Sequence, residues 1–205
     1  MPYVTSTLAK QWLGRSDSED DAEFVAALNA AERAIDRHCG QRFELAGSAT
    51  ARWFMVDSAG ELDIGAQGSV IGDTTGMVVA TDDNDDGTAE TTWSLSDYYT
   101  LPLNGLGPDG RTGWPVNRLV AVDRLFPTGT VRPGVQITAK WGWSTPPEQV
   151  LLAVRLLFAG WYQRRATVTG GGSFEGWFAS AIRDDSTVVD LLAPFRTGTA
   201  IAGMA

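Results

Sequence analysis

The sequence predicts an α+β fold, in which both chain ends form a small helical bundle and an antiparallel β-domain is inserted between them in the sequence. Apolar residues recur at helical spacing near both ends, and the middle alternates short apolar runs with Gly- and Asp-rich turns. The strand–helix–strand alternation of a parallel sheet is missing. We expect a helical core over residues 1–49 and 146–165, a sandwich or barrel-like β-domain over 50–145, and an extended, flexible C-terminal tail over 166–205.

Composition excludes several classes of protein. The 205 residues include 25 acidic and 16 basic ones, for a net charge of -9. This balance argues against a protein that grips nucleic acid over a broad face, which needs clustered Lys and Arg. Cys39 is the only cysteine, so an intrachain disulfide and a cysteine-based zinc site are excluded. The opening residues lack the pattern of a secretory signal, and no apolar run reaches membrane-spanning length.

Two helices are expected before the β-domain. Thr5 or Ser6 can cap a short helix that ends at Gly14. A second helix starts after Ser18, with acidic residues in its first turn, and stops at Gly40. Its buried face is predicted by residues at steps of four, three and four, namely Phe24, Leu28, Ala31 and Ile35.

Seven short strands are expected in the middle of the chain. They are bounded by Gly-, Asp- and Asn-containing turns, which favours an antiparallel unit. The segment is also the most acidic part of the chain, with 12 acidic and 6 basic residues over 50–145. The expected strands are Ala51–Val56, Leu62–Ile64, Met77–Thr81, Thr91–Leu95, Tyr98–Leu101, Leu119–Arg124 and Val135–Trp141.

The C-terminal part returns to a helical pattern. A long apolar helix opens at Glu148, after Pro146-Pro147, and is expected to be buried on more than one side. Gly170–Gly172 reads as a flexible joint. A last short helix over Val188–Leu192 can be capped by Asp184 or Asp185.

The sequence predicts no catalytic residues and no cofactor. His38 is the only histidine, and Cys39 next to it would point to a different side of the helix, so both are expected to be structural. A hydrolase using an acidic pair such as Asp57 and Asp63 is the least favoured hypothesis, because such pairs arise by chance among 25 acids.

One acidic segment resembles the first half of a calcium loop. Residues 82–87 place Asp82, Asn84 and Asp86 at alternate positions and glycine at the sixth. The twelfth position, where a bidentate Glu is required, is Trp93. The interpretation we favour is a hairpin tip with an Asp-Gly turn, and weak cation binding is the alternative.

Both flanks of the chain resemble head-to-tail connector (adaptor) proteins of tailed bacteriophages. The similarity covers about half of the chain, and it rests on the order and spacing of several short segments. These are Tyr3–Leu13, Ser16–Asp36, Cys39–Phe43, Trp141–Val150, Trp161–Arg165 and Val189–Arg196.

The resemblance implies a non-enzymatic virion protein that forms a ring of twelve copies beneath the portal. Such a ring bridges the portal protein to a stopper or tail-completion protein, and double-stranded DNA passes through its lumen without specific binding. The location implied is the neck of the virion at the portal vertex. Before assembly the protein would be in the host cytoplasm, and no membrane is involved. The tail would dock on the portal or on a neighbouring subunit, through Trp177, Phe178, Leu191, Leu192, Phe195 and Arg196. A β-domain that binds a small ligand or cation through loop 82–87 is the alternative function.

Overall fold

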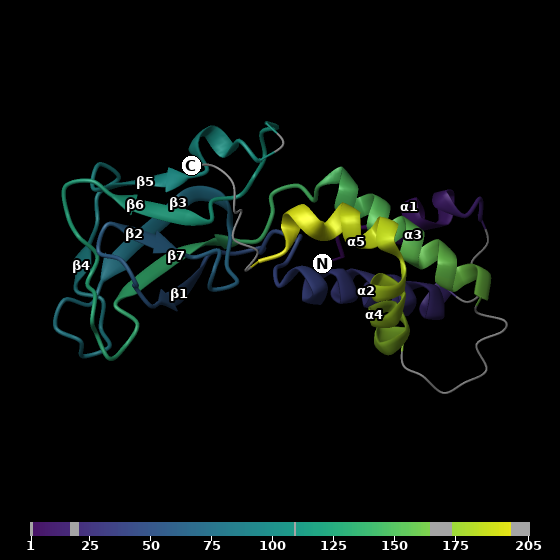
Figure 1. The fold of residues 1–205 in the computed structure, drawn as a ribbon, viewed down its shortest axis with the longest axis horizontal. Helices are drawn as coiled ribbons and strands as arrows, with labels where there is room; N and C mark the ends of the chain where they lie inside the picture. Colours follow the sequence, from purple (N-terminus) through teal and green to yellow (C-terminus); the bar gives the residue numbers. More distant parts are fainter. Residues whose placement is uncertain (1, 17–20, 109, 165–173, 198–205) are drawn as a thin grey trace. The chain divides into compact units, whose positions relative to one another are not determined.

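The computed structural model describes residues 2–16, 21–108, 110–164 and 174–197. The fold is α+β, as predicted. The chain divides into two compact units (Figure 1). The helical unit combines residues 1–44 with 146–196, and the β unit contains residues 45–145.

The N-terminal helices form where the capping and periodicity signals place them. Helix α1 (Ser6–Trp12) begins at Thr5, whose side chain accepts a hydrogen bond from the Leu8 amide. Helix α2 (Asp21–Cys39) ends at Gly40, whose φ of 70° is the left-handed conformation that suits glycine. All four residues of the predicted α2 face are buried. The proposed cap at Ser18 lies outside the described residues.

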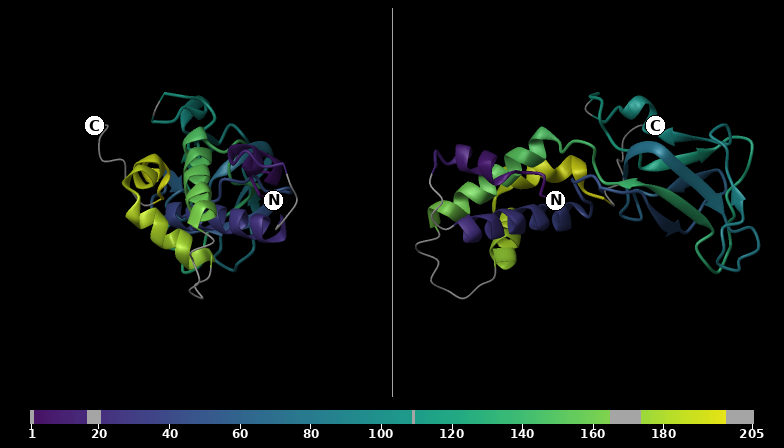
Figure 2. Two further views of the ribbon diagram at one scale, coloured as in Figure 1. Left: turned by 90° about the vertical axis from the view of Figure 1, so that its right-hand side faces the viewer. Right: turned by 180° about the vertical axis from the view of Figure 1, so that it is seen from behind.

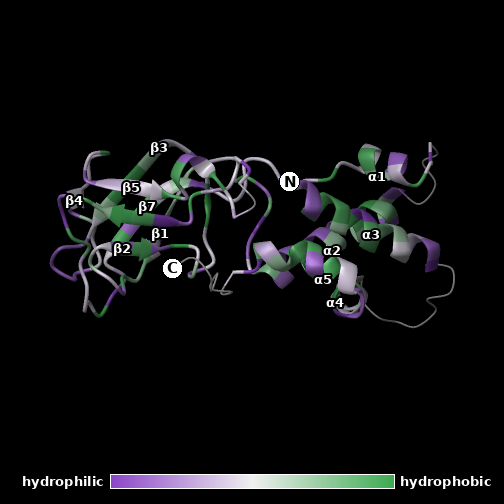
Figure 3. Ribbon diagram, turned by 45° about the horizontal axis from the view of Figure 1, so that its top comes forward, coloured by the Kyte–Doolittle hydropathy of each residue, from purple (hydrophilic) through white to green (hydrophobic). Residues whose placement is uncertain are grey.

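Helix α3 (Glu148–Arg164) is the centre of the helical unit. It contacts α1, α2 and two C-terminal helices, so its buried residues are covered on several sides, while Leu152 and Leu156 remain exposed. Phe24 of α2 meets Phe158 of α3 edge to face, with ring centroids 4.8 Å apart. Figure 3 shows the apolar stretches of α2 and α3 side by side.

The C-terminal segment differs from the extended tail that the sequence predicted. Residues 174–195 form α4 (Phe174–Asp184), α5 (Ser186–Leu192) and a 3-10 turn, η2 (Ala193–Phe195). Helix α4 packs mainly on α2, and α5 packs on α3 (Figure 2). The physical reason is that the apolar residues of this segment recur at helical spacing. They therefore form helix faces that are buried by packing on α2 and α3. Asp185 caps α5, as predicted, by accepting from the Thr187 and Val188 amides.

The β unit contains two antiparallel sheets. The first has the strand order β1-β7-β3-β4, from β1 (Thr50–Phe54), β7 (Val135–Trp141), β3 (Ile71–Thr81) and β4 (Thr91–Thr92). The second has the order β2-β6-β5, from β2 (Glu61–Asp63), β6 (Arg118–Ala121) and β5 (Tyr98–Leu101), and η1 (Leu103–Gly105) follows it. All seven predicted strands are present, and the described residues do not close into a barrel.

Side chains from both sheets fill one core. Along β7, Val135, Ile137, Ala139 and Trp141 are buried and alternate with more accessible residues. The core continues through Phe54, Val79 and Leu119, which come from three other strands.

Strand β3 is longer than predicted. Its first half, which contains Gly72 and Gly76, precedes the predicted strand Met77–Thr81, yet it pairs with β7 through two register shifts. A Cβ at Gly72 would lie 2.6 Å from the Gly142 carbonyl oxygen and 2.7 Å from the Ser144 amide nitrogen. Glycine therefore allows two backbone segments to approach at this bulge. In the described parts of the chain, no helix combines the length and apolarity needed to cross a membrane.

We expect Val188→Ala to lower the free energy of unfolding by about 2 kcal/mol, because it leaves a cavity where α5 meets α3. Val189→Ala is the matched control, since Val189 is less buried and should change stability by less than about 1 kcal/mol. Chemical denaturation of both variants measures the difference. Equal effects would show that α5 does not pack as described.

Candidate functional site

The acidic loop between β3 and β4 is built around Asp82. This side chain is 1% exposed, although it belongs to a loop with four further acidic residues. Its Oδ1 accepts from the amides of Asn84 and Asp86, and its Oδ2 accepts from the Gly87 amide at 2.7 Å. The buried carboxylate therefore closes the loop by satisfying three backbone N–H groups.

The rest of the loop is tied to the segment before β7. Both carboxylate oxygens of Asp85 accept from backbone amides, those of Val131 and Arg132, at 3.1 Å each. The Arg132 guanidinium donates to the Asp86 carbonyl oxygen. Asp85 has a φ of 60°, so the loop turns there through the left-handed region. These contacts make the loop a hydrogen-bonded unit.

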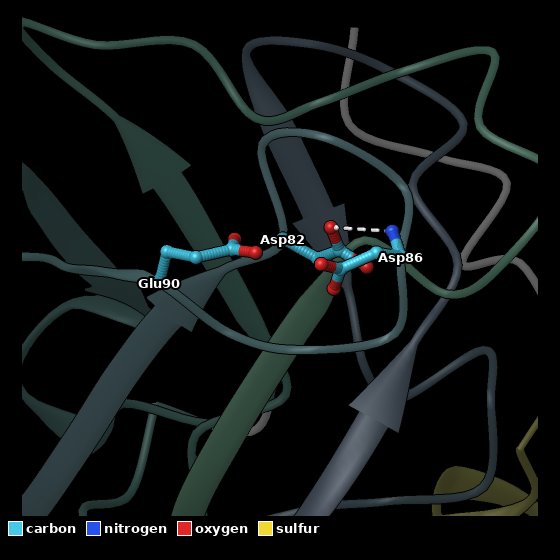
Figure 4. Close-up of side chains that lie close together, drawn as sticks. All are labelled: Asp82, Asp86 and Glu90. Atoms are coloured by element: carbon cyan, nitrogen blue, oxygen red, sulfur yellow. Dashed lines mark hydrogen bonds between the residues drawn. The ribbon is translucent and has the colours of Figure 1, made fainter.

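Three carboxylates of this loop lie within reach of one cation. Asp82, Asp86 and Glu90 each offer an oxygen, and the three atoms lie within 4.8 Å of one another (Figure 4). Of the residues predicted from the calcium pattern, Asp82 and Asp86 are brought together. The Asn84 side-chain oxygen accepts from the Asp86 amide at 3.0 Å. Glu90 was missed because the pattern places its acidic ligand at Trp93.

Trp93 has a structural role. It is 6% exposed and stacks on Phe126 with centroids 4.5 Å apart and ring planes 6° apart. Its indole N–H donates to the Thr81 hydroxyl. The loop is thus fixed to the core by its backbone and by an aromatic pair, so the geometry favours the hairpin-tip interpretation over an ion-dependent loop.

The helical unit contains a second group of acids, of which Glu32 is buried and Asp36 is half-buried. Glu32 is 5% exposed, and its Oε1 accepts from the Val4 amide at 2.7 Å. Asp36, one turn later in α2, accepts from the Phe43 amide at 3.3 Å. Tyr3 donates its hydroxyl to the Glu32 carbonyl oxygen. These contacts hold the segments before α1 and after α2 against the same helix.

Burial shifts the pKa of these groups. Desolvation raises the pKa of Glu32 to about 7, against the opposing effect of the Val4 amide. It raises the pKa of Asp36 to about 6 in the same way, with the Phe43 amide opposing it. The pKa of Tyr3 is also raised, by burial and then by the nearby charges of Asp36 and Glu32. Glu32 thus sits where its charged form is costly near neutral pH.

The remaining candidates for chemistry are in structural positions. Cys39 is buried, and desolvation raises the pKa of its thiol to about 12, which suppresses the nucleophilic thiolate. The pKa of His38 is lowered by burial and by Arg196. Asp63 uses both carboxylate oxygens, since Oδ1 accepts from the Ala66 amide and Oδ2 pairs with Arg118. This engagement disfavours the acidic pair with Asp57.

The predicted interface residues of the C-terminal segment fall into two groups. Phe178, Leu192 and Phe195 are buried inside the helical unit, at 0%, 0% and 4% exposure. In this conformation they stabilise the unit and are covered by it. The more accessible group is Trp177, Leu191 and Arg196.

Comparisons with known proteins identify similar folds in solved structures. No family model matches the chain, and no curated protein sequence matches it. The chain resembles one in the neck of an empty gene transfer agent (GTA) particle computed with C6 symmetry, with a TM-score of 0.54 and 18% identity over 98% of this chain and 93% of that chain.

Two further structures show the same likeness. The neck of the native GTA particle computed with C12 symmetry contains a chain 17% identical, at a TM-score of 0.54 over 98% of this chain and 94% of that one. The virion of the native gene transfer agent particle contains one 19% identical, also at 0.54, over 98% and 93%. At these identities the likeness shows the fold, and it extends over both the helical and the β unit.

The helical unit should lose stability as pH rises from about 4.5 to about 7. Since the folded state holds a proton on Glu32 that the unfolded state releases in this range, the contribution is complete below 4.5 and lost above 7. Glu32→Gln keeps an acceptor for the Val4 amide and should remove about 2–3 kcal/mol of this pH dependence. Denaturation at pH 4.5 and 8 measures it, with Glu23→Gln, exposed on the same helix, as the control. Identical pH profiles of Glu32→Gln and the unchanged protein would refute the assignment.

Asp82→Ala should lower the free energy of unfolding by about 2 kcal/mol, because three backbone N–H groups lose their acceptor. Exposed Asp123 provides a control, and Asp123→Ala should change stability by less than about 0.5 kcal/mol. Thermal denaturation of both variants measures the difference. The same thermal denaturation of the full-length protein, repeated with millimolar calcium, should give an unchanged midpoint. A calcium-dependent rise that Glu90→Gln abolishes would contradict the structural interpretation and assign a cation site.

Proposed function

We propose that this chain is a structural component of the neck of a phage-like particle. In this proposal it forms a ring of twelve copies beneath the portal and bridges the portal to the stopper or tail-completion protein. The observation that carries the proposal is the likeness in fold, over 98% of the chain, to a chain in a neck with C12 symmetry. The connector resemblance of both chain flanks supports it independently of the fold.

The charge of the chain suits a channel for DNA. Double-stranded DNA must pass through such a ring without being retained, and like charge prevents phosphates from binding. The net charge of -9 has this sign. The ring therefore conducts DNA without a specific nucleic-acid site.

The C-terminal segment is the proposed contact with the portal. Because Phe178, Leu192 and Phe195 are covered by the helical unit, the contact uses the outer residues Trp177, Leu191 and Arg196. Helices α4 and α5 then present a preformed surface to the portal. A preformed surface loses less conformational entropy on binding than an extended tail does.

Cation binding at loop 82–90 is the second candidate function. The observation that favours it is the approach of the carboxylates of Asp82, Asp86 and Glu90 within 4.8 Å. The three backbone N–H groups already bound by Asp82 weigh against it. The calcium melts described above separate the two interpretations.

Particles purified from cells that encode the chain should contain it at a one-to-one ratio with the portal protein, that is, about twelve copies. Quantitative mass spectrometry of the particles measures this ratio. Deleting the gene should yield DNA-filled heads without attached tails, visible by electron microscopy, and the wild-type gene in trans should restore them. Absence of the chain from purified particles would refute the proposal.

A further inference from the structure

We infer that one end of the β unit is a docking surface for another protein of the particle, one that combines apolar side chains with Lys or Arg. This inference rests on the proposed function for the identity of the particle. The surface, called the tip here, consists of the loop 55–60, the segment 82–97, which includes the short strand β4, and the loop 122–134. It is distinct from the portal contact proposed for α4 and α5.

Strand register brings the three loops to the same end of the β unit. Phe54 at the end of β1 and Thr81 at the end of β3 both pair with Val135, the first residue of β7. Tyr98 at the start of β5 pairs with Ala121 at the end of β6. Backbone hydrogen bonds then join the loops directly, from the Phe126 amide to Ala59 and from the Val122 amide to Asp97. Figure 1 shows these loops together beyond the ends of the strands.

The tip exposes large apolar side chains to an unusual degree. Val131 is 89% exposed, Leu95 77% and Leu125 72%, which are the three highest values among the large hydrophobic residues of the described chain. Val122 adds a fourth such residue at 54%. An exposed leucine is ordinary by itself, whereas a group of them on adjoining loops indicates an interaction surface.

The exposed side chains stand on a fixed base. Leu125 precedes Phe126, which is buried in the stack with Trp93. Arg124 lies over the Trp93 ring at 5.5 Å and pairs with Asp97 at 3.9 Å. The backbone of Val131 is bound by Asp85. The apolar groups are thus presented by loops whose own contacts are already made, which lowers the entropy lost on binding.

Charge specifies the partner. The tip carries eight acidic and two basic residues, whereas the remainder of residues 45–145 carries four of each. The full excess of negative charge in the β unit is therefore at the tip. A second copy of this chain is a poor occupant, since the helical unit is also negative, with 13 acidic and 10 basic residues over 1–44 and 146–196. Nucleic acid is excluded by the same sign, so a basic and apolar protein surface fits best.

The direct test places a photo-crosslinking benzoylphenylalanine at Leu125 of the full-length chain and irradiates assembled particles. We expect a crosslink to a different particle protein, within a segment that contains apolar and Lys or Arg residues, identified by mass spectrometry. The same probe at Leu103, which is 57% exposed and beyond the other end of β5, is the matched control and should not label that segment. A crosslink from Leu125 only to a second copy, or to nothing, would overturn the inference.

A second measurement uses charge at the apolar positions. The double variant Leu125→Asp and Val131→Asp should reduce the yield of completed particles at least ten-fold, with the chain still incorporated and its thermal melt unchanged. Leu103→Asp should leave the yield unchanged. Normal completion with the double variant would refute the docking role while the chain's presence in particles upholds the proposed function. Absence of the unchanged chain from particles would refute both the docking role and the proposed function.

Discussion

The helical unit depends on the burial of α3 from several sides at once. Six of its side chains are buried, and they lie around so much of the helix that α2 alone cannot cover them. The cover comes from the first 44 residues on one side and from α4 and α5 on another. Segments far apart in the sequence are therefore held together by one helix, and the carboxylates of Glu32 and Asp36 on α2 bind the residues that precede α1 and follow α2.

The β unit is stabilised differently, because its two sheets bury each other's apolar side chains. Its core needs nothing from the helical unit, and the strands leave their loops free to differ in chemistry. At the tip, the buried Asp82 and the Trp93–Phe126 stack fix loops whose outer side chains are apolar and acidic. The stable β scaffold thus presents an apolar and acidic surface of the kind found at protein–protein contacts.

The α+β class, the helix ends and the strand positions follow from local signals. The helix ends depend on residues within one helical turn: Thr5 and Asp185 accept hydrogen bonds from backbone amides, and Gly40 adopts a left-handed conformation. Helix α4 was missed because the glycine run before it suggested a tail, although Phe178 and Ile182 are spaced for one helical face. The contact of Glu90 with Asp82 depends on how the loop closes. The first half of β3 depends on a bulge that Gly72 allows, and neither feature is local in sequence.

The division of the helical unit between the two chain ends has a consequence for biosynthesis. Helix α2 leaves the ribosome about a hundred residues before its partner α3, and the complete β unit is translated in between. The β unit can therefore fold as an independent body while the apolar face of α2 is still uncovered. The Ala46 amide donates to the Trp141 carbonyl oxygen at 2.8 Å, so the folded β unit holds its two ends near each other and shortens the loop that α2 and α3 must close. The folded insertion thus favours the pairing of the helices that precede and follow it in the sequence.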